Sequence, residues 1–90
     1  MKIDLEKIET IYGNNCIYEI KDNLDDVVSN INYLNTKGFT NVYEIVESYP
    51  YLFIESNDIF IEKIDLFLTN IGFDYLDILS NDMTLWGDIL

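Results

Sequence analysis

The feature that most constrains the fold is an internal repetition in which residues of like character recur 34 positions apart. The dipeptide Gly-Phe fixes this offset, because it occurs at positions 38–39 and again at 72–73 (72 − 38). Further pairs share the spacing: Val27 with Ile61, Tyr33 with Phe67, Leu34 with Leu68, Val42 with Leu76, and Ile45 with Leu79. Carried backwards, the offset also pairs Ile8 with Val42, Ile11 with Ile45, and Ile20 with Ile54. Such a period is typical of stacked repeats, so we predict about two and a half copies of one unit.

The first third of the chain shows helical periodicity, with one ambiguous stretch. An amphipathic helix is predicted over residues 1–12, with an apolar face made of Leu5, Ile8, Ile11 and Tyr12. A second helix is capped by Asp22 or Asn23 and ended by Gly38, with an apolar face made of Leu24, Val27, Val28, Ile31 and Leu34. Between them, the alternation of residues 16–20 suits a short strand, whereas the repeat offset favours a helical turn.

The rest of the chain also predicts helices. A short helix over residues 42–49, capped by Thr40, is closed by Pro50, because proline pushes the residue before it out of helical geometry. A longer helix, capped by Ser56 or Asn57, extends to residue 70, and a last one follows Asp74 before an apolar tail at residues 83–90. We therefore expect one acidic all-α domain over residues 1–90, a short stack of four or five helices in pairs. Its core is expected to include Leu34, Ile45, Ile64 and Leu68.

The unit over residues 42–73 joins a short helix ending at proline, a helical turn, and a longer helix that closes in Leu-Thr-Asn-Ile-Gly-Phe. This order of parts resembles the repeat of the mitochondrial transcription termination factor (mTERF) family. A tetratricopeptide repeat has a similar period but needs small residues where its helices cross, and this chain contains no alanine. The mTERF resemblance is best over residues 23–73 and implies a helical solenoid. For the family, it also implies nucleic acid binding along a basic concave face.

The charge of the chain departs from that family function. Seventeen acidic residues against five lysines give a net charge of −12, which repels phosphates and anionic membranes and attracts basic proteins. No apolar run is long enough to span a membrane, and the start of the chain does not read as a signal peptide. The single cysteine, Cys16, fits a reducing compartment. We expect a cytoplasmic protein of a bacterium or a phage-infected host cell, since the composition is typical of an AT-rich genome.

The sequence offers little material for catalysis or for binding a metal or cofactor. There is no histidine to activate Cys16 as a nucleophile, and Cys16 is expected to be a small buried hydrophobe. The carboxylate groups Asp25–Asp26, Glu44–Glu47 and Asp74–Asp77 are most simply helix caps and solvated helix faces. No calcium loop, zinc cluster or phosphate-binding glycine loop is present. We therefore predict that the protein is not an enzyme and needs no cofactor or metal.

The negative charge and the lack of residues for catalysis or metal binding together suggest a small non-enzymatic module that binds a basic surface of a larger protein. The concrete hypothesis is an inhibitor that presents carboxylates where a nucleic acid would present phosphates, such as a phage anti-defence protein of the anti-CRISPR type. Direct binding of nucleic acid is not expected under this hypothesis. Two alternatives stay open: a nucleic-acid-binding protein of mTERF type, and a structural or regulatory adaptor.

The contact residues are predicted from the outward sides of the short helices. If the repeats stack, their acids and aromatic residues gather on one flank, which we call the short-helix flank: Tyr43, Glu44, Glu47, Tyr75 and Asp77. Asp58, Glu62 and Asp65, on the outer face of the long helix, form a competing acidic patch. Trp86 adds a contact candidate in the apolar tail, which needs a cover, either from the first helix of the chain or from a second copy in a homodimer.

Overall fold

The structure is a computed structural model that describes residues 3–89, and over this range it is entirely helical. Its elements are α1 (Leu5–Tyr12), α2 (Asn14–Asp22), α3 (Leu24–Thr36), α4 (Val42–Ser48), α5 (Pro50–Phe53), α6 (Asn57–Ile71), α7 (Tyr75–Asn81) and the 3-10 helix η1 (Met83–Ile89). The all-α prediction is confirmed, and the ambiguous stretch at residues 16–20 lies within α2. Met1, Lys2 and Leu90, which fall in the predicted first helix and tail, lie outside the described residues.

Glycine ends both long helices, as the sequence predicts. Gly38, beyond the end of α3, has φ +94°, and Gly72, the C-cap of α6, has φ +101°. A side chain disfavours this left-handed region, so glycine is the residue that lets the chain turn back there. At Gly38 an added Cβ would also lie 3.1 Å from Leu76 Cδ1, so the turn approaches α7 closely. Because glycine follows both long helices, the chain turns in a similar way after α3 and after α6, and each turn leads to a short helix, α4 or α7.

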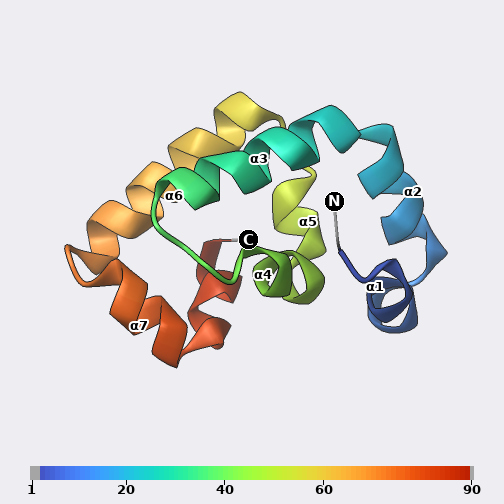
Figure 1. The fold of residues 1–90 in the computed structure, drawn as a ribbon. Coiled ribbons are helices and arrows are strands. Elements are labelled where there is room, and N and C mark those ends of the chain that lie inside the picture. The colour runs from blue at the N-terminus through green and yellow to red at the C-terminus, as the bar shows by residue number, and fades with distance from the viewer. Residues whose placement is uncertain (1–2, 90) are drawn as a thin grey trace.

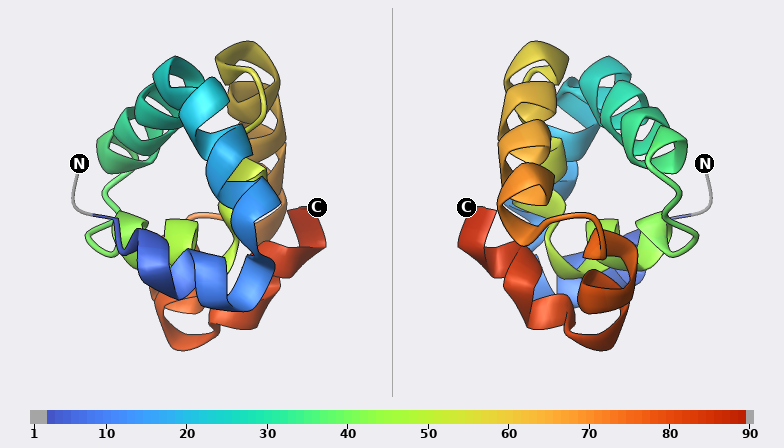
Figure 2. Two further views of the ribbon diagram at one scale, coloured as in Figure 1. Left: turned by 90° about the vertical axis from the view of Figure 1, so that its right-hand side faces the viewer. Right: turned by 90° about the vertical axis from the view of Figure 1, so that its left-hand side faces the viewer.

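The two long helices run side by side in the same direction (Figure 1). Near their starts, an Asp26 carboxylate oxygen on α3 accepts the backbone N–H of Asn57 on α6 at 3.1 Å. Further along, the ammonium of Lys37, just after α3, lies 3.7 Å from a carboxylate oxygen of Asp65 in the middle of α6. Figure 2 shows this pair on one side of the molecule and the short helices α1, α4 and α7 on the other. The short helices contact each other in the same order as the long pair: α1 contacts α4, and α2 contacts α5.

The core lies between these layers and follows most of the predicted apolar stripes. Leu34, Ile45, Ile64 and Leu68 are all buried, which confirms the predicted core positions. The prediction is wrong for Leu24 and Val28 of the second predicted helix and for Leu5 and Ile11 of the first, all of which are exposed. On α3 the buried stripe is instead Val27, Asn30, Ile31 and Leu34, so a polar residue takes the place expected for an apolar one.

The segment after α7 folds back onto the core. In η1, Trp86 is fully buried, and its ring contacts Phe39 and Phe67 at centroid distances of 5.3 Å and 5.4 Å. The tail is thus covered by α6 and by the segment that precedes α4, and not by the first helix.

Candidate partner-binding surface

Some residues of the short-helix flank are exposed to solvent, and others are packed against the rest of the chain. Tyr43 and Glu44 on α4 are exposed, and so is Asp77 on α7. Glu47, one turn after Tyr43, faces α1: its side chain is only 14% exposed and lies 3.4 Å from the Lys7 ammonium. Its second oxygen accepts the backbone N–H of Asp4 at 3.4 Å. Glu47 therefore joins α4 to α1, and the freely accessible members of the flank are Tyr43, Glu44 and Asp77.

The two other aromatic candidates are held inside the molecule. The Tyr75 hydroxyl donates to the backbone carbonyl of Lys37 at 2.7 Å, and its ring packs on Phe39. Trp86 is buried, and its indole N–H has no acceptor among the residues that the structure describes. Trp86 therefore offers no surface to a partner in this conformation, and Tyr75 offers only part of its ring.

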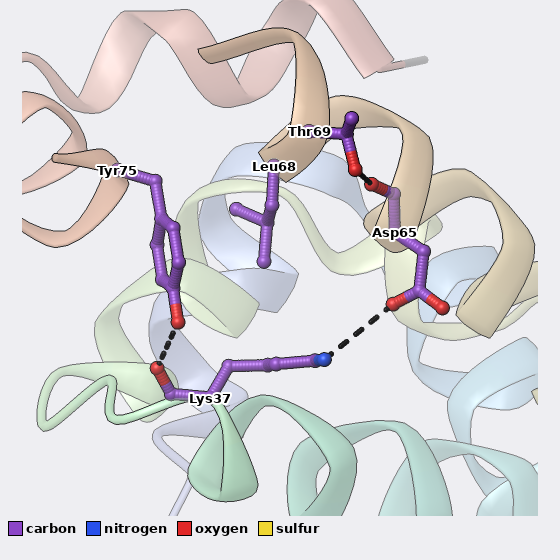
Figure 3. A pocket seen from close by; sticks show the side chains of 5 residues that line it. All are labelled: Lys37, Asp65, Leu68, Thr69 and Tyr75. Carbon is purple, nitrogen blue, oxygen red and sulfur yellow. Dashed lines mark hydrogen bonds and ion pairs between the residues drawn. The ribbon is translucent and has the colours of Figure 1, made fainter. Parts of the chain in front are cut away.

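A cleft of about 390 Å³ opens beside Tyr75, between the ends of α3 and α6 (Figure 3). Its lining is Lys37, Asp65, Leu68, Thr69 and Tyr75. The polar groups in it already have partners within the chain: Lys37 lies near Asp65, Thr69 donates to the Asp65 carbonyl at 2.7 Å, and Tyr75 donates to the Lys37 carbonyl. These contacts tie α3, α6 and the start of α7 together, which gives the cleft a structural role.

Lys37 and Tyr33 form a second link at the same place. The Lys37 ammonium lies 5.1 Å from the centre of the Tyr33 ring, and the Tyr33 hydroxyl donates to the Asp65 carboxylate. The hydrogen bond with Tyr33 is the main cause that raises the pKa of Lys37. Burial, followed by the bond to Asp65, raises the pKa of Tyr33. Both groups therefore keep their protons at neutral pH, and Asp65 is committed to contacts within the chain.

A third group of acids lies where the two long helices begin; the sequence suggests helix caps for three of them and assigns the fourth, Asp58, to the competing patch on the long helix. We call Asp22, Asp25, Asp26 and Asp58 the helix-start cluster. The first three line one shallow hollow between α2 and α3, together with Lys21. The hydrogen bond from Asn57 to Asp26 brings the start of α6, with Asp58, to the same place. The repeat offset could have indicated this grouping, since it pairs the starts of the two long helices.

The remaining groups with potential for nucleophilic or metal chemistry, in the part of the chain that the structure describes, are the Cys16 thiol and the carboxylates. Cys16 is buried, and this burial is the main cause that raises the pKa of its thiol above the usual 9.0, which disfavours the reactive thiolate. Across residues 3–89, no three potential metal ligands among histidine, cysteine and carboxylate side chains come together. Within the same range, none of the helices has the length and apolar character needed to cross a bilayer.

Comparison of the chain with models of protein families, with curated protein sequences and with solved structures gave no match.

Proposed function

We propose that this chain is a non-enzymatic module that binds a basic surface of a larger protein through its carboxylates. The observation that carries the proposal is the number of acids that have no cation beside them. Of the seventeen acidic residues, fourteen are exposed. Ion pairs within the described residues involve three acids, Glu47, Glu55 and Asp65. The remaining carboxylates create a negative potential that favours a basic partner and repels phosphates.

In its specific form, the proposal is an inhibitor that occupies the nucleic acid site of its target. Exposed carboxylates on rigid helices can take the positions that phosphates take in a bound strand. A high negative charge fits a phage anti-defence protein of the anti-CRISPR type, acting in the cytoplasm of the infected cell. Tyr43 sits next to Glu44 and is exposed, so it supplies an aromatic anchor among the charges.

We further infer that the helices form a short mTERF-like repeat stack. The contacts of α1 with α4, of α2 with α5 and of α3 with α6 support this inference, because each joins two elements related by the repeat offset. The role of such a stack here is to hold the acidic side chains at fixed distances. The composition of this chain does not supply the cations for the basic face of the mTERF family, so the inference concerns architecture alone.

The partner-binding prediction compares two triple variants that each remove three charges. The first, Glu44→Gln with Glu47→Gln and Asp77→Asn, is expected to weaken binding at least tenfold, a loss of about 1.4 kcal/mol. The second, Asp22→Asn with Asp25→Asn and Asp58→Asn, is the matched control in the helix-start cluster and is expected to weaken binding less. The partner is first isolated by affinity capture from a low-GC bacterial lysate and identified. The purified pair is then measured by calorimetry at two salt concentrations.

Glu47 needs a separate control because it also pairs with Lys7. The double variant Glu44→Gln with Asp77→Asn leaves that pair intact and should keep most of the loss. Association of the unmodified pair should also slow strongly as salt is raised. If both triple variants bind normally and salt has no effect, the acidic surface serves solubility only. A larger loss in the control variant would move the contact to the helix-start cluster.

Nucleic acid binding is the second candidate function, because it is the use that the mTERF resemblance implies. We expect no binding of duplex DNA or RNA near physiological salt, since that binding depends mainly on neutralising phosphates with lysine and arginine. A gel-shift titration with a mixed-sequence duplex tests this directly. A clear shift at low-micromolar protein would reverse the order of the two candidates.

A further inference from the structure

At one end of the helical stack, two large apolar side chains are exposed at positions that are buried further along the chain. Ile11 on α1 is 61% exposed, whereas Ile45, 34 positions later, is fully buried. Tyr18 on α2 is 60% exposed, and its equivalent, Leu52 on α5, is also fully buried. The α1 and α2 end therefore carries the surface that the same positions of α4 and α5 bury inside the molecule. We call Ile11 and Tyr18 the leading face.

The opposite end shows the reverse pattern. Phe73, just before α7, is 87% exposed, whereas its equivalent Phe39 is buried. Leu76 on α7 is 37% exposed, whereas its equivalent Val42 is buried. Leu5, which precedes Phe39 by 34 positions, is 36% exposed, so the first repeat does not bury this position as fully as the second. We call Phe73 and Leu76 the trailing face. Figure 1 shows α1 and α2 at one end of the molecule and α7 at the other.

An internal contact shows how two such faces fit. Phe39 packs edge-on against Trp86 at a centroid distance of 5.3 Å. Phe39 is equivalent to Phe73 of the trailing face, and Trp86 lies 34 positions after Leu52 and so is equivalent to Tyr18 of the leading face (86 − 52 = 52 − 18). The molecule therefore already contains one copy of the pairing that would join a trailing face to a leading face.

We propose that a second copy of this chain binds head to tail, with Phe73 of one copy packed against Tyr18 of the next. The internal contact between Phe39 and Trp86 favours this pairing of ends over others. Both ends are acidic, but residues 72–90 carry four carboxylates and no lysine, whereas residues 3–22 carry five carboxylates and two lysines. A trailing face would meet more repulsion from a second trailing face than from a leading face. An interface between two different faces does not close on itself, so further copies can add in the same direction.

The net charge of −12 on each copy opposes this association, and that sets its salt dependence. Salt at about 1 M reduces the Debye length to about 3 Å, so it removes most of the repulsion and leaves the apolar contact. Self-association should therefore strengthen as salt is raised. Docking onto a basic partner should weaken under the same change, so the two proposals can fail independently.

The test uses the 90-residue chain alone in sedimentation experiments over a wide concentration range, at low and high salt. We expect reversible association at high salt. Phe73→Ser and Tyr18→Ser should each weaken it at least about tenfold, because each removes one side of the contact. Leu66→Ser is the matched control, since Leu66 is an exposed apolar residue on α6 outside both faces. It should associate like the unmodified chain. Circular dichroism of each variant confirms that the helices are intact.

Mixing the two variants separates head-to-tail binding from a symmetric dimer. The Phe73→Ser chain retains a leading face, and the Tyr18→Ser chain retains a trailing face, so an equimolar mixture should form a one-to-one pair that grows no further. A monomer at all concentrations in high salt would overturn the proposal. So would a mixture in which neither variant associates, or a control variant that loses association as strongly as the other two.

Discussion

Replacing Trp86 with alanine is expected to lower the free energy of unfolding by about 3–5 kcal/mol. Trp86 is the only tryptophan, is fully buried in η1, and contacts the rings of Phe39 and Phe67. Its removal takes away transfer free energy and leaves a cavity between α6 and the segment before α4. A domain of this size is expected to unfold with about 5–15 kcal/mol, so the substitution removes a large share of the stability.

The measurement is urea unfolding followed by circular dichroism at 222 nm, because the alanine variant has no tryptophan fluorescence to follow. Trp86→Phe is the informative companion. It keeps an aromatic ring between Phe39 and Phe67 and removes an indole N–H that has no acceptor in the described part of the chain, so it should cost clearly less than alanine. Tyr43→Ala, at an exposed position, should change stability little. An alanine variant as stable as the unmodified chain would mean that η1 is detached in solution.

Much of the fold could be predicted from the sequence because the information for it is local. Helical periodicity and the glycines at 38 and 72 placed the long helices, and the offset of 34 favoured a helix for residues 16–20. The predicted number of four or five helices is too low, because the turn after Pro50 and the segment from Met83 each form a short helix of their own. Local patterns indicate where a helix can form, but short segments become helical through the contacts that cover them.

The errors share one physical cause, which is that the deciding partner lies far away in the chain. Leu24 and Val28 fit the apolar period of α3, which predicts them in the core, whereas the buried position belongs to Asn30. The partners of Asn30 lie 23 and more positions away, so no local pattern shows that its amide is satisfied. Glu47 faces inward for the same reason, since its partner Lys7 lies on α1.

The second large effect is expected for Asn30→Ala, which should lower the free energy of unfolding by about 2–4 kcal/mol. The Asn30 side chain is fully buried. Its amide nitrogen donates to the carbonyls of Phe53 and Glu55, each at 2.9 Å, and its oxygen accepts from the Asn57 side chain at 2.9 Å. The residue therefore fixes the turn between α5 and α6 against α3. Alanine would leave these partners without their bonds in a place that admits little water.

Asn32→Ala is the matched control, because Asn32 lies on the same helix, is exposed, and gains the same helix propensity on replacement. The difference in urea midpoint between the two variants then isolates the buried contacts from the intrinsic effect of alanine. Asn57→Ala removes a single member of the network and should cost less than Asn30→Ala. The double variant should cost less than the sum of the two single ones, because the bond between the two side chains is counted in both. Equal midpoints for Asn30→Ala and Asn32→Ala would show that the turn between α5 and α6 is not held by this amide. The buried stripe of α3 would then owe its stability to Val27, Ile31 and Leu34 alone.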